Sequence, residues 1–194
     1  MNSLITTIIF DFYGVIRADG LRAWLKENGF KFEGDFRCSD ELRCVGKINK
    51  QEYFEILSKL SSQDQEKIEQ RMRDLSTLNK QVLGLVQKLR DMGYKLALLS
   101  NSTDSTQEYI ESNGIGEYFD EMILSHKIGI IKPNKEIFSY ALGKLNITLA
   151  EAIFIDDKSE NTEVAEQFGI KSIVFKSYKQ LVRELERLLG RKIK

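Results

Sequence analysis

The sequence predicts an α/β protein built on a doubly wound parallel sheet, with a small all-helical cap inserted after the first strand. Two patterns favour this class. From Leu78 onward, short apolar runs alternate with amphipathic helical patterns, which is the order in which a parallel sheet is built. The run over 4–10 is β-branched and apolar, as expected of a central strand buried on both faces. The chain of 194 residues is long enough for one such domain with an insertion, but not for two large domains.

Between the first strand and Leu78, the pattern is helical. A short helix around Trp24 ends at Gly29, a second starts at Asn49 with a capping-box glutamate three residues later, and a polar helix follows over 62–75. No repeat, low-complexity tract or flexible linker interrupts the chain. We therefore expect two parts. The core comprises residues 1–16 and 78–194, and the cap comprises residues 17–77.

The remainder of the chain supplies the other elements of the sheet domain. Asn79 is expected to cap the first helix and Gly93 to end it, since asparagine and glycine favour these positions. Asn113-Gly114 and Gly169 end two later helices in the same way. The helices are expected over 79–92, 104–112, 134–145, 159–168 and 178–189, and the strands over 95–100, 122–125, 151–156 and 171–175.

Composition excludes several classes of function. Lys plus Arg and Asp plus Glu both number 29, so the net charge is zero and no global field recruits nucleic acid or an anionic membrane. The lone histidine, His126, excludes sites built from several imidazoles. Cys38 and Cys44 lack a CxxC spacing and suit reduced, structural thiols. No apolar run has the length of a membrane span and the first residues lack the pattern of a signal peptide, so the cytoplasm is the expected compartment.

Polar residues stand where four of the predicted strands end. They are Asp11-Phe12-Tyr13-Gly14, Ser100-Asn101, Lys132-Pro133 and Asp156-Asp157. Parallel sheets bind ligands at the carboxyl ends of their strands. A carboxylate, a hydroxyl, a cation and a carboxylate pair at one sheet edge form the set expected of a metal-assisted anion site.

These segments resemble the motifs of the haloacid dehalogenase superfamily of hydrolases, most of which are phosphatases. The resemblance covers the whole chain and implies a Rossmann-like core, with a helical cap between the first and second motifs. The four motifs in order are far more specific than any one of them. The segments that carry the resemblance are IIFDFYGVI, LLSNST, GIIKPNKEIF and IFIDDKSENTEVAEQFG.

The resemblance implies a role for each candidate residue. Asp11 would be the nucleophile that forms an aspartyl phosphate, and Lys132 would neutralise Asp11 and the phosphoryl oxygens. Ser100 would donate its hydroxyl to a phosphate oxygen, while Asn101 is either a substrate contact or a helix cap. The backbone N–H groups of Tyr13 and Gly14 complete the implied substrate contacts.

Mg²⁺ is the expected cofactor. Two carboxylates about 4 Å apart repel by roughly 4 kcal/mol at an effective dielectric near 20, so a carboxylate pair beside Asp11 requires a cation or a raised pKa. Mg²⁺ takes hard oxygen ligands and retains waters and substrate phosphate. Asn161 is expected to orient Lys132 or a metal ligand. The implied ligands are Asp11, the backbone carbonyl of Tyr13, Asp157, and Asp156 either directly or through water.

Tyr13 departs from the phosphatase pattern, which places a second aspartate at this position as general acid and base. A phenol with a pKa near 10 replaces that aspartate poorly. Three functions therefore remain open. The first is a phosphatase for a small phosphomonoester, such as a sugar phosphate, that manages without this aspartate. The second is a 2-haloacid dehalogenase, which the DxYG and LSN segments resemble, with Asp11 attacking carbon. The third is a binding or regulatory module without turnover.

The cap is expected to carry substrate specificity, although its residues favour structural roles. Its aromatic residues, such as Trp24, Tyr53 and Phe54, are expected to form the core of the cap itself. Its cationic residues, such as Arg22 and Arg43, could face a second anionic group of a substrate, but residues of this kind on a small helical insertion are expected at the solvated surface. The expected partner is a small phosphorylated molecule, with no nucleic acid and no membrane, and the chain is expected to be a monomer or homodimer.

Overall fold

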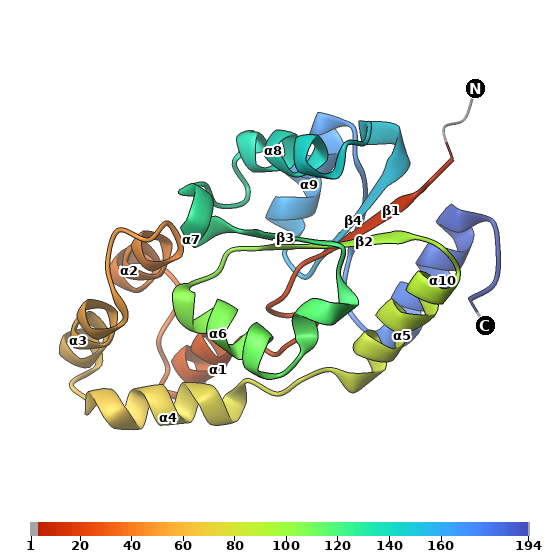
Figure 1. Cartoon of the computed structure of the whole chain (residues 1–194). Coiled ribbons are helices and arrows are strands. Elements are labelled where there is room, and N and C mark those ends of the chain that lie inside the picture. The colour runs from red at the N-terminus through yellow and green to blue at the C-terminus, as the bar shows by residue number, and fades with distance from the viewer. Residues whose placement is uncertain (1–3, 194) are drawn as a thin grey trace.

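The structure, a computed structural model that describes residues 4–193, contains one parallel sheet of five strands (Figure 1). The strand order is β3-β2-β1-β4-β5, so the first strand of the chain lies at the centre. Ile9 pairs with Ala97 on one side and with Phe154 on the other. The predicted α/β class is therefore confirmed. The strands are β1 (Thr7–Phe10), β2 (Lys95–Ser100), β3 (Glu121–Leu124), β4 (Ala152–Asp156) and β5 (Lys171–Val174).

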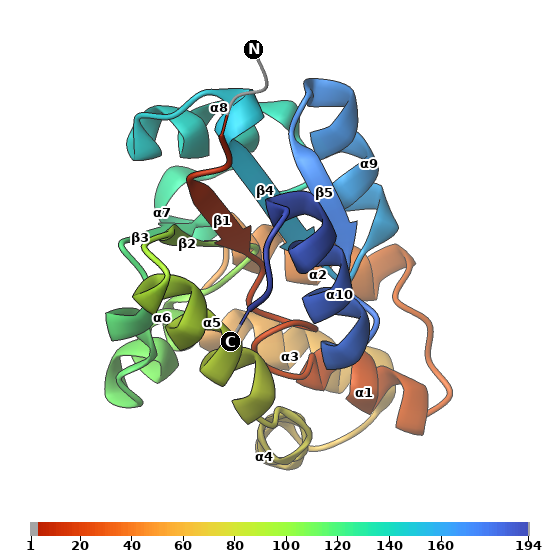
Figure 2. The same cartoon turned by 90° about the vertical axis from the view of Figure 1, so that its right-hand side faces the viewer.

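Helices cover both faces of the sheet, because alternate strand residues point to opposite sides. Ile8 and Phe10 join a core cluster with α5 and α10, whereas Ile9 joins a second cluster with α8 and α9. Figures 1 and 2 show the two helical layers on either side of the sheet. The helices of these layers are α5 (Lys80–Asp91), α6 (Asp104–Ser112), α8 (Lys135–Leu145), α9 (Ser159–Phe168) and α10 (Tyr178–Leu189).

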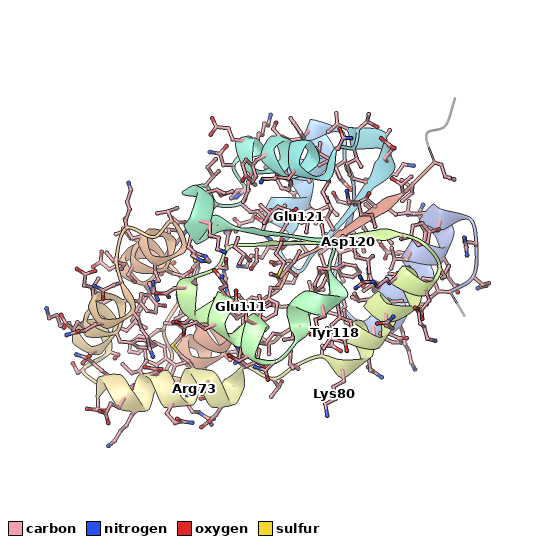
Figure 3. All side chains as sticks on the ribbon, in the orientation of Figure 1. Arg73, Lys80, Glu111, Tyr118, Asp120 and Glu121 are labelled. Atoms are coloured by element: carbon pink, nitrogen blue, oxygen red, sulfur yellow. The ribbon has the colours of Figure 1, made fainter. Side chains whose placement is uncertain are left out.

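Four further helices between β1 and α5 form a separate group, here called the insertion. It has its own apolar cluster, in which Trp24, Tyr53 and Leu57 are buried. The insertion lies beyond the carboxyl ends of the strands, while Asp120 and Glu121 mark the opposite end of the sheet at the start of β3 (Figure 3). The helices are α1 (Gly20–Glu27), α2 (Gly34–Cys44), α3 (Lys50–Ser61) and α4 (Gln65–Leu75).

The two connections of the insertion run side by side. Arg17 forms an antiparallel bridge with Leu78, and the Ala18 N–H donates to the Thr77 carbonyl at 2.9 Å. The chain therefore leaves the core and returns to it at one place, next to the end of β1. This arrangement sets the insertion over the strand ends.

Several expected boundaries differ from the structure. Helix α2 was not predicted, because its sequence GDFRCSDELRC has no apolar period to signal a helix. Helix α4 begins at Gln65 rather than 62, since Ser62 adopts the left-handed conformation and Asp64 caps the helix. The short helix α7 (Ser125–Ile128) was also missed, so Lys132 follows β3 only after an intervening turn of helix.

The capping residues explain the boundaries that agree. The side chain of Asn79 accepts from the Val82 N–H, as expected of an N-cap, and Gly169 ends α9 with a φ of 104°. None of the helices within residues 4–193 combines the length and the apolar character that crossing a membrane would require.

Candidate active site

The site lies at the carboxyl ends of β1, β2 and β4. Asp11 directly follows β1 and is only 4% exposed. One of its carboxylate oxygens accepts the Phe12 N–H at 2.7 Å and lies 2.8 Å from the Lys132 ammonium. These contacts hold the carboxylate in one orientation at the edge of the sheet.

Lys132 is buried at the centre of the site. Its Nζ donates to the Leu99 carbonyl at 2.9 Å and to Asp156 Oδ2 at 2.6 Å, in addition to its contact with Asp11. The Asn101 side chain binds the main chain of Lys132 twice, accepting from its N–H at 2.7 Å and donating to its carbonyl at 2.9 Å. Asn101 therefore fixes the loop from which the lysine reaches the nucleophile.

Asp156 lies beneath the site as a fully buried carboxylate. Besides Lys132, it accepts the Lys158 N–H at 2.9 Å and the Asn161 amide at 2.9 Å. Asn161 thus contacts a carboxylate of the acidic group, which is the contact expected of a residue that orients a metal ligand.

Three carboxylates converge at this point. One oxygen each of Asp11, Asp156 and Asp157 lies within 4.8 Å of the others. Asp157 Oδ1 is buried, and the part of the chain that the structure describes offers it no hydrogen-bond partner. Orphaned buried acceptors are rare and costly, and an oxygen-only set suits a hard divalent cation. The residues present therefore fit a metal ion.

The electrostatics of the site agree with this interpretation. Burial and the neighbouring Asp156 raise the pKa of Asp11 to about 8, although Lys132 opposes the rise. Burial also raises the pKa of Asp157. Burial alone would lower the pKa of Lys132, but the carboxylates of Asp11 and Asp156 outweigh it and the pKa lies above its usual value. Additional positive charge is needed to keep the carboxylates ionised together.

Two implied phosphate donors have other partners. The Gly14 N–H donates to the Arg17 carbonyl at 2.7 Å, so this donor is engaged within the loop. Ser100 is fully buried, and its hydroxyl donates to the Asn101 carbonyl at 3.2 Å. Asn101 is not a helix cap, because Thr103 caps α6.

The Tyr13 side chain is not suited to proton transfer at neutral pH. Its hydroxyl lies 3.1 Å from the Thr106 hydroxyl, and burial raises its pKa to about 12. The ring nitrogens of His126 contact the side chains of Ser102 and Gln107 at 3.3 Å and 3.2 Å. Neither side chain offers a replacement for the missing aspartate.

A cavity of about 450 Å³ lies between the insertion and the strand ends, and Asp11, Lys132 and Asn101 line it. Its other walls include insertion residues that the sequence placed elsewhere. Arg22 and Arg43 line the cavity rather than a free surface, and Tyr53 serves both the core of the insertion and the cavity wall. Two further lining residues, Arg17 and Asp40, carried no signal in the sequence.

Comparison with known proteins places this site in a family. A model of the haloacid dehalogenase-like hydrolases matches residues 8–175, a span that contains all the site residues above. A HAD family enzyme from Bacteroides thetaiotaomicron, solved as a magnesium complex, has a similar fold, with a TM-score of 0.74 and 24% identity over 90% of this chain and 94% of that one. The chain therefore belongs to the haloacid dehalogenase-like hydrolases, which are enzymes.

Curated relatives differ in how much of their length the chain matches. D-ribitol-5-phosphate phosphatase from Bacteroides thetaiotaomicron is 25% identical over 192 residues, covering 87% of this chain and 91% of that protein. Mouse acyl-CoA dehydrogenase family member 10 is 34% identical over 107 residues, or 54% of this chain. The matched part covers only 10% of that mouse protein. It covers 22% of another relative, rat bifunctional epoxide hydrolase 2, so the chain corresponds to a small part of each.

Proposed function

We propose that this chain is a Mg²⁺-dependent phosphatase that hydrolyses a small phosphomonoester, such as a sugar phosphate, through a phosphorylated Asp11. The observation that carries the proposal is the buried group of Asp11, Asp156 and Asp157, with an unpartnered oxygen on Asp157. Three carboxylates against one ammonium leave a negative site that a divalent cation would balance. The similarity to D-ribitol-5-phosphate phosphatase supports the same chemistry.

The chain's own residues account for the main steps. Asp11 attacks phosphorus, forming an oxygen–phosphorus bond while the bond to the leaving alcohol breaks. Lys132, 2.8 Å from Asp11, neutralises charge on the transferring oxygens. Water then attacks phosphorus, which releases phosphate and restores the carboxylate.

A bound Mg²⁺ would supply positive charge that allows Asp11 and the phosphoryl group to approach each other. Asp11 and Asp157 would hold it, together with the Tyr13 carbonyl. Asp156 would contribute directly or through water, because its oxygens already bind Lys132 and Asn161. Ser100 would turn its hydroxyl from the Asn101 carbonyl toward the phosphate.

Tyr13 limits the substrates in this proposal. Without a general acid beside Asp11, leaving groups that need no protonation are favoured, such as anomeric or acyl phosphates. In this proposal the partner is a small phosphorylated molecule. The protein acts in the cytoplasm, as a monomer or a homodimer.

A 2-haloacid dehalogenase is the second candidate, and the Tyr13 position favours it. In that reaction Asp11 would displace halide from carbon, and no proton needs to reach the leaving group. The acidic group argues against it, since displacement at carbon gains nothing from Asp157 held beside the nucleophile. A binding module without turnover ranks third, because Asp11 and Lys132 are both present and in contact.

The test compares hydrolysis of acetyl phosphate with halide release from 2-chloropropionate, with and without Mg²⁺. We expect phosphate release only with the metal, and its loss in Asp11→Asn. Asp91→Asn is the matched control, because Asp91 lies exposed at the end of α5. Halide release without metal would overturn the phosphatase in favour of the dehalogenase. Near-normal phosphate release by Asp11→Asn would overturn the covalent mechanism.

A further inference from the structure

Arg17 is a buried cation without an acidic partner. Three cationic residues are buried within residues 4–193, and Arg17 is 7% exposed. The other two are compensated, because Arg43 pairs with Asp104 and Lys132 pairs with two carboxylates. No carboxylate of the described residues lies within ion-pair distance of Arg17. Buried charges without a partner are costly, which points to a ligand.

The Arg17 side chain is held from two directions. Its Nε donates to the Ser76 carbonyl at 3.0 Å, and the guanidinium carbon lies 3.5 Å from the centroid of the Tyr109 ring. The main chain is fixed as well, since the Arg17 N–H donates to the Phe12 carbonyl at 2.9 Å. The two terminal nitrogens have no hydrogen-bond acceptor in the described chain, so the donors suited to a forked contact stay available.

Arg17 lines the same cavity as the nucleophile. The lining includes Arg17 and its neighbours Tyr13 and Tyr109, together with Asp11 and Lys132 at the strand ends. A phosphate attacked by Asp11 would occupy the position beside Lys132. The remainder of the substrate would then extend into the cavity that Arg17 faces.

Most of the other cations that line the cavity form ion pairs, whereas Lys158 lines it without an ion pair among the described residues. Arg22 lies 3.6 Å from Asp19, and its guanidinium carbon is 3.9 Å from the centroid of the Phe32 ring. The acidic residue Asp40 presents less than a full charge, because burial and nearby Asp19 raise its pKa to about 7. Further ion pairs in the lining join Arg37 to Glu41, and Lys50 and Arg73 to Glu69.

We propose that Arg17 binds a second anionic group of the substrate, so that the enzyme acts on small phosphomonoesters that also carry a carboxylate or a second phosphate. This inference rests on the proposed phosphatase activity. A guanidinium fork fits both groups, and its stacking on Tyr109 holds it ready for either. Arg17 is thus a specificity-determining residue and takes no part in bond breaking.

The experiment uses substrates that differ in this second group. Glycerol 3-phosphate has none, 3-phosphoglycerate has a carboxylate, and 1,3-propanediol bisphosphate has a second phosphate. The wild type should prefer one or both anionic substrates, and the preferred one identifies the group. In Arg17→Met we expect kcat/KM for that substrate to fall about 10- to 100-fold through KM, as for loss of a charge-assisted contact. For glycerol 3-phosphate, kcat/KM should change less than about threefold, because this substrate has no second anionic group for Arg17 to bind.

Two variants separate binding from folding. Arg17→Lys keeps the positive charge but lacks the two forked donors of the guanidinium. It should recover part of the substrate preference that Arg17→Met loses. Arg183→Met removes an exposed arginine of α10 and should leave the preference unchanged. Calorimetry with malonate gives a readout without turnover, in which Arg17→Met should lose the binding that the wild type shows.

The outcomes distinguish the two proposals. Hydrolysis of glycerol 3-phosphate that equals or exceeds that of both anionic substrates, and is insensitive to Arg17→Met, would overturn the role of Arg17 and leave the phosphatase standing. Absence of hydrolysis of all three and of acetyl phosphate, whose leaving group needs no protonation, would count against the phosphatase, while malonate binding would still test Arg17. Malonate binding of equal strength in wild type and Arg17→Met would overturn the anion contact.

Discussion

Lys132 is shared by two carboxylates that follow different strands. Its ammonium lies 2.8 Å from Asp11 and 2.6 Å from Asp156, so a single positive charge serves the nucleophile and the carboxylate beneath it. Asp157 receives no such contact, and its Oδ1 has no partner among residues 4–193. At the scale of single residues, the balance of charge is therefore the main argument for a metal ion.

Tyr13 provides the sharpest residue-scale prediction. Tyr13→Asp would place a carboxyl at the position where the phosphatase pattern implies a general acid. We expect hydrolysis of alkyl phosphates, whose leaving groups need protonation, to speed up by at least about tenfold relative to acetyl phosphate. The rates are measured at saturating Mg²⁺, because another acid beside Asp11 increases the need for the metal.

Tyr13→Phe is the matched control for this substitution. It removes only the hydroxyl that contacts Thr106 at 3.1 Å, and should leave the ratio of the two rates unchanged. An equal loss with both leaving-group classes in Tyr13→Asp would contradict the prediction and assign the ring a packing role.

The sequence predicted the residues that meet at the sheet edge, because strand ends of a parallel sheet converge and the motifs lie there. It could not predict which hydrogen-bond partners these residues have within the loops. Asn101 binds the main chain of Lys132, and Gly14 donates to Arg17, through contacts that depend on loop conformation. Arg17 gave no signal, because a buried cation is recognised only when its neighbours in space are known.

The loop that follows β1 is the element on which the site depends. Its turn at Gly14 has a φ of 82° and brings the backbone against the Asp157 side chain. A Cβ on Gly14 would lie 2.2 Å from the Asp157 carboxyl carbon, far closer than van der Waals contact. The glycine thus permits both the turn and the approach of the carboxylate.

Gly14→Ala should therefore displace Asp157 and weaken Mg²⁺ binding at least about tenfold, measured by calorimetry. The left-handed conformation alone costs of order 1 kcal/mol in stability. Gly29→Ala separates the two effects, because Gly29 has a φ of 72° but no atom within 4 Å of a built Cβ. Equal Mg²⁺ affinity in Gly14→Ala and the wild type would show that the close approach does not matter for the metal.

Elements differed in how well the sequence predicted them. Strand β1 and helix α5 were clear because apolar period and capping residues agree. Helix α2 was missed because it packs as part of an assembled insertion rather than through an apolar face of its own, with Ser39, Arg43 and Cys44 as its buried residues. Its residues define one wall of the cavity, which is why that wall was unexpected.

At the scale of the whole molecule, α2 is anchored to the core at two points. Arg43, which is buried, forms an ion pair with Asp104 at the start of α6. The Ser125 hydroxyl donates to the Cys44 carbonyl at 2.6 Å. These contacts are additional to the pairing of the two connecting segments, so the insertion is held to the core at more than one place.

Asp104→Asn should destabilise the protein by about 1–2 kcal/mol, since it leaves Arg43 buried without its counter-charge. Urea denaturation measures the loss. Burial alone would raise the pKa of Asp104, but Arg43 and Ser105 lower it on balance. The difference between variant and wild type should thus be present at neutral pH and vanish as the pH falls below the ordinary pKa of 3.8.

A double-mutant cycle provides the control. Arg43→Met together with Asp104→Asn removes both charges, and should cost less than the sum of the single changes. Additive losses would mean that the ion pair does not hold α2 to the core.

The place where the insertion joins the core has a consequence for protein engineering. Ala18 and Thr77 are hydrogen-bonded to each other, and the insertion has its own apolar cluster. The segment between them is therefore a cassette, whose ends a short turn can join without moving β1 or α5. Exchange for a cassette from another hydrolase would alter about half of the residues that line the cavity. Arg17 lies on the core side of the junction, so a chimaera would inherit its affinity for a second anion from the recipient.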